Sequence, residues 1–319
     1  MNTMPIFTKL WSESRVLTVT CVLMLLAFLC FVPGIYLDPR IITGAPAWLK
    51  PAKFAISTLI FAASMAWLFQ YLTTSPKLKR GLAWTLSSAL VLEVAIISVQ
   101  AARGSTSHFN AGTALDGALF SVMGVGIAVL WICMLWVAVL LFRQRFANAA
   151  FGWALRFGMA ISVAGASAAG LMLPPNQQQI ETLKRHERPM TIGAHTVGAP
   201  DGGEGLPGVG WSARHGDLRI PHFFGLHALQ VIPFCAWLFT RRRTATVKQE
   251  TRAIFFIAVS YLALIAILTW QALRGQSIAE PDAATLSAFA AWLFATVSAM
   301  IWCRRGAPGK LAVSNRLIA

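Results

Sequence analysis

The chain has 319 residues, of which 56% are hydrophobic and 12% are charged, and its formal net charge is +15. A charged fraction so far below the roughly 25% of soluble domains excludes an ordinary soluble globular protein. The basic stretch around Arg241 has no interleaved aromatic residues and no accompanying nucleic-acid-binding domain, so we expect no nucleic-acid partner. The composition therefore predicts an all-α polytopic membrane protein whose main partner is the lipid bilayer.

Apolar runs recur along the chain, and each is long enough to cross about 30 Å of hydrocarbon at about 1.5 Å per residue. The first run is too long for a cleaved signal peptide, so we expect it to be retained. We predict a single membrane domain over residues 1–319 with eight transmembrane helices. The predicted spans cover residues 16–36, 52–72, 82–101, 118–142, 151–173, 222–239, 253–272 and 283–302.

The distribution of lysine and arginine predicts the orientation of these helices. If the N-terminus is cytoplasmic, the inner segments hold Lys77, Lys79, Arg80, Arg145 and the run Arg241–Arg243. Basic residues crowd short cytoplasmic loops next to span ends, which is the positive-inside bias. We therefore expect a multi-pass protein of the plasma (inner) membrane with both termini in the cytoplasm.

Two similar stretches predict an internal duplication. The third apolar run ends with Gln-Ala-Ala-Arg-Gly at residues 100–104, and the seventh ends with Gln-Ala-Leu-Arg-Gly at residues 271–275. Asp116 opens the fourth run and Asp282 opens the eighth. The pattern predicts two four-helix repeats, residues 16–142 and 151–302, in parallel orientation because four is an even number. The second repeat contains an inserted external loop, residues 174–219, in which Trp211 favours packing as a lid.

Polar residues near the predicted outer span ends indicate a functional site. Glu93 is the sole acidic residue within the interior of a predicted span. An ionisable group at such a depth is costly and by default marks function, with a partner facing the bundle interior. We expect Lys53 or His227 to be that partner, and we assign the catalytic roles to Glu93, His227 and Lys53. Lys50 is expected to extend toward the lipid headgroups.

Further polar groups at the same end of the predicted bundle could bind an anionic or lipid-like ligand. His186 and His195 are interpreted as ordinary loop histidines. The predicted substrate-binding residues are Arg103, Gln100, Gln230, Asn110 and Arg274.

A metal or haem cofactor is the competing chemistry. His108, His215, His222 and His227, with Glu93 or Asp217 as an oxygen ligand, would suit zinc, copper or iron, but no HExxH or CxxC spacing supports the site. The favoured ligands among them are His108, His222 and His227. The duplicated arrangement is similar to that of haem A synthase, a family that carries histidine pairs in both halves. Here Leu264 stands where Glu93 stands in the first copy, and the last span has no histidine. The similarity is therefore confined to architecture, and the cofactor stays open between none, a transition metal and haem.

These residues lead to one favoured function and two alternatives. The favoured function is a membrane-embedded enzyme or a metal or haem cofactor site, acting on a small or lipid-like substrate at the external (periplasmic) face. The first alternative is a transporter of a small molecule or ion, and the second is a membrane sensor or assembly factor. Transporters commonly place their sites at the midplane on broken helices, whereas the polar cluster here is at the outer mouth.

Overall fold

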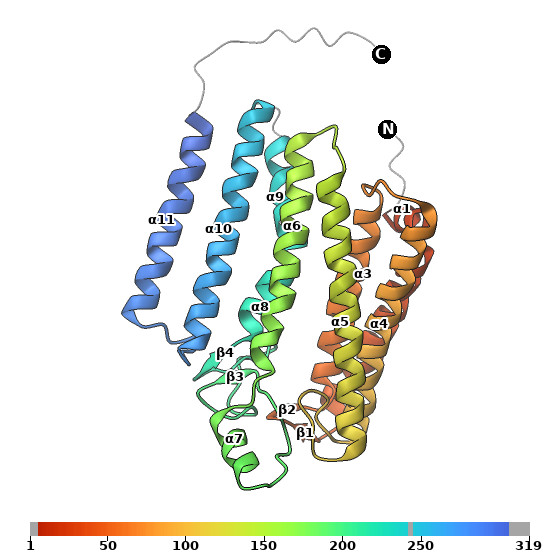
Figure 1. The fold of residues 1–319 in the computed structure, drawn as a ribbon, viewed down its shortest axis with the longest axis vertical. Helices are drawn as coiled ribbons and strands as arrows, with labels where there is room; N and C mark the ends of the chain where they lie inside the picture. Colours follow the sequence, from red (N-terminus) through yellow and green to blue (C-terminus); the bar gives the residue numbers. More distant parts are fainter. Residues whose placement is uncertain (1–5, 242–244, 306–319) are drawn as a thin grey trace.

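The computed structural model describes residues 6–241 and 245–305, so Arg242 and Arg243 lie outside the described residues. The described chain forms a helical bundle whose helices run roughly side by side (Figure 1). Residues 38–48, 103–113, 174–218 and 274–282 connect helices at one end of the bundle, which we call the loop end.

The first part of the bundle contains α1 (Ile6–Glu13), α2 (Arg15–Leu37), α3 (Leu49–Phe69), α4 (Pro76–Ala102) and α5 (Ala114–Arg143). The amphipathic helix α1 lies at the end opposite the loop end. A polar side chain caps the N-terminus of most of the long helices by accepting a backbone N–H, which satisfies a donor that the helix cannot satisfy itself. The capping residues of α2, α4 and α5 are Ser14, Ser75 and Thr113.

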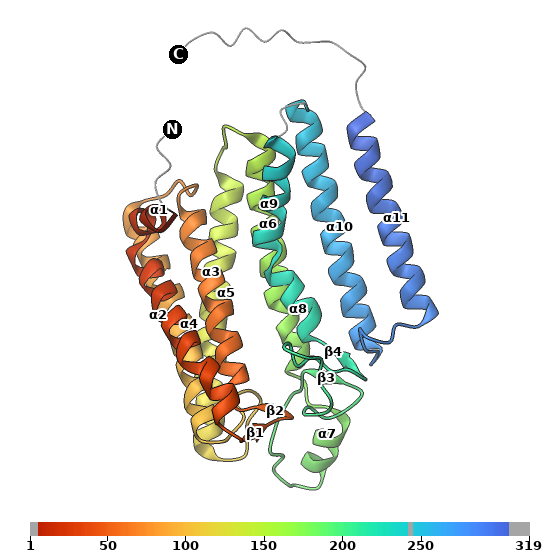
Figure 2. The ribbon, with the colours of Figure 1, turned by 180° about the vertical axis from the view of Figure 1, so that it is seen from behind.

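The second part contains α6 (Ala149–Ser167), its 3₁₀ continuation η1 (Ala168–Met172), α8 (Arg219–Leu226), α9 (Ala228–Arg241), α10 (Val247–Leu273) and α11 (Ala283–Arg305). Helix α6 packs against α5 and so joins the two parts, while α11 lies at the edge beside α10 (Figure 2). Within the described residues, seven helices are long and apolar enough to cross a membrane, and the bent pair α8–α9 gives an eighth if it counts as one span. These helices are consistent with an integral membrane protein.

The sixth predicted span is not one continuous helix. Helices α8 and α9 meet at His227 with a bend of 45°. Ser162 of α6 inserts its hydroxyl at the break, where it donates to the carbonyl of Leu226 (2.9 Å) and accepts the N–H of Leu229 (3.0 Å). Insertion of a side chain into the helical hydrogen-bond ladder is a recognised cause of sharp bends. This interaction belongs to tertiary structure, so hydropathy along the chain does not reveal it.

Helices α6 and α8 approach each other closely because glycine occupies both contact positions. A Cβ atom on Gly225 would lie 2.3 Å from the Cα of Gly165, and one on Gly165 would lie 2.4 Å from the Cα of Gly225. Such distances leave no room for a side chain on either helix. The close approach fixes α8, which carries His222, against α6.

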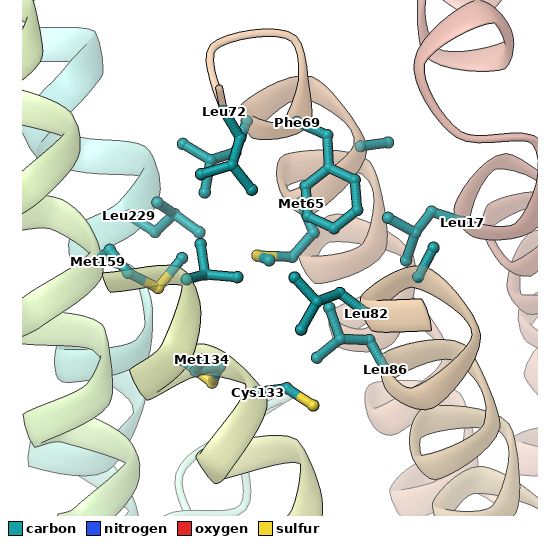
Figure 3. Close-up of a cluster of buried hydrophobic side chains, with 14 of the residues drawn as sticks. Leu17, Met65, Phe69, Leu72, Leu82, Leu86, Cys133, Met134, Met159 and Leu229 are labelled. Atoms are coloured by element: carbon teal, nitrogen blue, oxygen red, sulfur yellow. The ribbon is translucent and has the colours of Figure 1, made fainter. Parts of the chain in front are cut away.

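Apolar side chains of both parts of the bundle meet in a shared core. Leu17 of α2, Met65 and Phe69 of α3, Met134 of α5 and Met159 of α6 are fully buried there. Figure 3 shows these side chains converging, with Leu229 of α9 beside Met159. Close packing of this kind holds membrane helices together by van der Waals contact.

Short elements organise the loop end. Strands β1 (Ile41–Ile42) and β2 (Ala45–Pro46) form one antiparallel ribbon, and β3 (Thr196–Val197) pairs with β4 (Gly216–Asp217) in another. Helix α7 (Gln177–Lys184) begins with a capping box formed by Asn176 and Gln179. An isolated bridge between Gly205 and Ser212 closes a third hairpin, residues 204–213, which we call the cap hairpin.

The two similar stretches adopt the same local structure. Helices α4 and α10 both end with a glycine of positive φ, Gly104 (71°) and Gly275 (72°). At each helix end the residue after the glycine, Ser105 or Gln276, donates its backbone N–H to the carbonyl of the glutamine, Gln100 or Gln271, as in a Schellman motif. The arginine before each glycine then pairs with an aspartate at the start of the next helix, Arg103 with Asp116 in the first turn of α5 and Arg274 with Asp282 just before α11. Duplication of the complete four-helix unit stays a prediction.

Candidate functional site

A cavity of about 1680 Å³ is lined by α3, α4, α5, η1, α8 and the segments of the loop end. Toward the middle of the bundle its wall is apolar, and toward the loop end it is polar and charged. The apolar wall includes Leu90, Ile127, Leu130 and Met134. The polar wall includes Lys50, Lys53, His108, His195, Asp201, Arg219 and His222. Glu93 also lines the cavity, on α4 about one helical turn farther from the loop end than Ile97.

Glu93 projects from α4 and is 5% exposed. Its Oε1 lies 3.4 Å from Nε2 of His108, which follows α4 in the loop before α5. The ammonium group of Lys50 is also close enough to interact with it electrostatically. The expected partners, Lys53 and His227, line the same cavity but make their own contacts elsewhere. His108 is therefore the closest polar partner of Glu93.

His108 is enclosed by aromatic rings, including those of Phe54, Phe109 and Phe120. Burial, followed by the positive charge of Lys50, holds the pKa of His108 well below its usual range. The imidazole is therefore neutral at neutral pH. Its Nδ1 lies 3.1 Å from the hydroxyl of Ser107, so both ring nitrogens have a polar neighbour.

His195 and Asp201 form a second histidine–carboxylate pair in the inserted loop. Nδ1 of His195 lies 2.7 Å from Oδ2 of Asp201, and the backbone N–H groups of His195 and Thr196 donate to the same carboxylate. Burial opposes ionisation of Asp201, but these hydrogen bonds outweigh it and hold its pKa well below the usual range. The pKa of His195 is lowered, because burial outweighs the hydrogen bond to Asp201.

The backbone of the inserted loop places this pair in the cavity. The N–H of Ala194 donates to the carbonyl of Met172 in η1, and the carbonyl of His195 accepts the N–H of Leu218. As a result the His195 ring lies 6.3 Å from the His108 ring, measured between centroids. Sequence reasoning interpreted His195 as an ordinary loop histidine and did not consider Asp201. A glycine-rich loop has no periodicity that predicts which side chains meet.

His222 and His227 lie on the bent pair of helices. Nδ1 of His222 is 2.8 Å from the carbonyl of Gly165, and the ring of His227 packs on Phe223 with a centroid distance of 4.3 Å. Gln230 donates to the hydroxyl of Ser64 at 2.8 Å and so connects α9 to α3. All three of these α8–α9 side chains line the cavity.

Three of the basic residues that line the cavity, Lys50, Lys53 and Arg219, differ in their contacts. Lys53 donates to the carbonyl of Val209 in the cap hairpin. Arg219 donates to both oxygens of Asp217 and, at 2.6 Å, to the carbonyl of Gly210. Lys50, expected to extend toward lipid headgroups, instead lines the cavity, and among the described residues its ammonium group has no hydrogen-bond acceptor. Lys53 and Arg219 thus hold the cap hairpin over the site, while Lys50 remains available to a ligand.

Most of the predicted substrate-binding residues make contacts outside the cavity wall. Arg103 and Gln100 donate to Asp116, with the Arg103–Asp116 distance at 2.7 Å. Arg274 pairs with Asp282 between α10 and α11, and Asn110 donates to Ser105 and Thr106 within the loop that it occupies. Of this predicted set, Gln230 lines the cavity.

The predicted metal ligands do not gather around one point. Within residues 6–241 and 245–305, no group of three or more histidine, cysteine, aspartate or glutamate side chains is placed to hold a metal ion. His108, His222 and His227 each have a different neighbour, Glu93, Gly165 and Phe223 respectively. A bare ion usually needs at least three protein ligands, so this arrangement gives a metal site no support.

Comparisons with known proteins leave this site to be interpreted from its own geometry. A scan against protein-family models, a search of curated proteins and a search of solved structures gave no match to the chain.

Proposed function

We propose that the chain is a membrane-embedded enzyme that binds an amphipathic substrate in the cavity described above. The observation that carries the proposal is the division of the cavity into an apolar wall on α4 and α5 and a polar wall at the loop end. A lipid-like molecule has the same division. Its chain would lie along Leu90, Ile127 and Met134, and its polar group would lie near Lys50 and the histidines.

The size of the cavity also fits this class of ligand. Sites for drug-sized ligands measure about 300–1,000 Å³, and the cavity measures about 1680 Å³. A long-chain amphiphile together with water at its polar group would fill that larger volume. The cap hairpin, held by Lys53 and Arg219, would cover the polar group from the loop end. Given the predicted topology, that end is the external face of the membrane.

A fluorescent amphiphile tests the proposal. Dansylundecanoic acid should bind the chain in nanodiscs with a blue shift of its emission. A Cβ atom at Gly124, which lines the cavity, meets no heavy atom within 4 Å, so Gly124→Phe should narrow the apolar part of the cavity without a local clash. Gly81→Phe is the matched control, because Gly81 is equally open but lies outside the cavity wall. Loss of the shift in Gly124→Phe alone is expected, and equal binding to both variants would contradict the proposal.

The bend between α8 and α9 favours transport as a second candidate function. Discontinuous helices commonly line the sites of secondary transporters, and here the break at His227 lies in the cavity wall. The same amphiphile would then cross the membrane unchanged. Proteoliposomes loaded with dansylundecanoic acid distinguish the functions, because a transporter releases intact probe whereas the proposed enzyme does not.

A further inference from the structure

Several nitrogen atoms in the polar part of the cavity have no hydrogen-bond partner among the described residues, and three of them bear on the chemistry of the site. They are Nε2 of His195, Nε2 of His222 and Nζ of Lys50. In both histidines the partner of Nδ1 requires that Nδ1 carry the ring proton. The Gly165 carbonyl can only accept, so Nδ1 of His222 carries the proton, and the ionised Asp201 requires a proton on Nδ1 of His195. Both Nε2 atoms therefore present a free lone pair to the cavity.

The two histidines differ in what orients them. His195 is held by a carboxylate that two backbone N–H groups fix in place, whereas His222 is held by a neutral carbonyl. A carboxylate on Nδ1 sets the tautomer of an imidazole and stabilises the imidazolium that forms when Nε2 takes a proton. The arrangement of His195 and Asp201 is thus suited to general-base catalysis.

The charges around His195 indicate which substrate group lies there. Lys50 and Arg219 both interact electrostatically with His195. Asp201 and Asp217 already have partners in His195 and Arg219, and Glu93, which contacts His108, interacts with Lys50 electrostatically but without a hydrogen bond. The free ammonium group of Lys50 is left to bind an anionic group of a ligand, and a phosphate offers it both charge and acceptor oxygens.

We propose that His195, oriented by Asp201, is the general base for hydrolysis of an amphipathic phosphate ester whose phosphate is bound by Lys50. This inference rests on the proposed function, because it assigns the chemistry of the same cavity. His222 is not assigned a role in the reaction.

The reaction uses water as its second reactant. Nε2 of His195 takes a proton from the water molecule as the water oxygen forms a new bond to phosphorus. The bond between phosphorus and the lipid alkoxide oxygen breaks, and the alkoxide takes the proton from the His195 imidazolium. The products are the lipid alcohol and phosphate, no electrons are transferred to or from the protein, and His195 returns to its neutral form.

Acylation by diethyl pyrocarbonate tests the role of Asp201 without a known substrate, because the reagent attacks an unprotonated imidazole nitrogen. The chain would be purified in dodecyl maltoside, and peptide mass spectrometry would give separate rates for His195 and His222. Asp201→Asn should slow acylation of His195 by about three- to tenfold, the effect of about one unit of imidazole basicity. His222 lies in the same cavity but is not bonded to Asp201, so its rate should not change. An unchanged rate at His195, or an equal fall at both histidines, would overturn the assignment.

Protection by dodecyl phosphate tests the substrate class. Dodecyl phosphate should protect His195 from acylation in the wild-type chain and in the control Lys77→Met, but not in Lys50→Met. Failure to protect, or equal protection in Lys50→Met, would overturn the assignment of a phosphate group. If dansylundecanoic acid still binds in that case, the further inference is wrong and the proposed function stands; if neither amphiphile binds, both are wrong.

Discussion

At the scale of single residues, the polar end of the cavity depends on imidazoles that are neutral when folded. The pKa values of His108 and His195 are both lowered, in each case first by burial. Histidine in an unfolded chain has a pKa of about 6.5. Below that pH the unfolded chain therefore binds protons that the folded chain does not, and the folded state loses stability.

We accordingly expect the melting temperature to fall when the pH is lowered from about 7.5 to about 5.5, the range in which unfolded histidine becomes charged. His108→Asn should make this fall smaller, because it removes one of the buried histidines, whereas His186→Asn at an exposed loop position should leave it unchanged. Differential scanning fluorimetry of the purified chain measures both effects. The same fall in wild type and His108→Asn would show that His108 does not cause it.

Glu93 could be identified from the sequence, because a single acidic residue in an apolar run stands out in any fold. Its partner could not be identified, because the contact between Glu93 and His108 depends on how the loop after α4 turns back over the helix end. His195 and Asp201 were missed for the same reason, because hydrogen bonds of a glycine-rich loop to η1 and α8 bring them into the cavity.

At the scale of helices, the close contact between α6 and α8 positions His222. It also keeps Ser162 of α6 at the break between α8 and α9, where the chain bends at His227. Gly225→Ala should destabilise the chain, because the added Cβ would lie 2.3 Å from the Cα of Gly165 and the two backbones would have to separate. Overpacking of this kind costs about 1–3 kcal/mol. Gly81→Ala is the control, since nothing lies within 4 Å of its Cβ position. A thermal shift no larger in Gly225→Ala than in Gly81→Ala would contradict the close packing.

Hydropathy predicted the long helices well, because their composition alone decides that they are apolar. The main discrepancy is the sixth span, which Ser162 interrupts from a neighbouring helix. The Gln-Ala-x-Arg-Gly stretches, by contrast, adopt a structure that depends on residues close together in the sequence. There a local motif determines a local structure, so the glycine of positive φ and the arginine–aspartate pair recur at both helix ends.

At the scale of the whole molecule, the basic residues near the end opposite the loop end predict that this end is cytoplasmic. Reporter fusions after Arg80 and Arg145 should give a cytoplasmic signal, and a fusion after Pro200 should give an external one. An external signal from either arginine position would reverse the orientation. The site would then face the cytoplasm, and its substrate would have to reach it from that side.

If the cavity holds an amphipathic ligand, the ligand should stay bound when the chain is released from its own membranes, and native mass spectrometry detects it there. We predict one bound amphiphile per chain in the wild type and in Gly81→Phe, and its loss in Gly124→Phe, which narrows the apolar part of the cavity. A wild-type chain with no bound amphiphile, or one that Gly124→Phe retains in full, would contradict the claim.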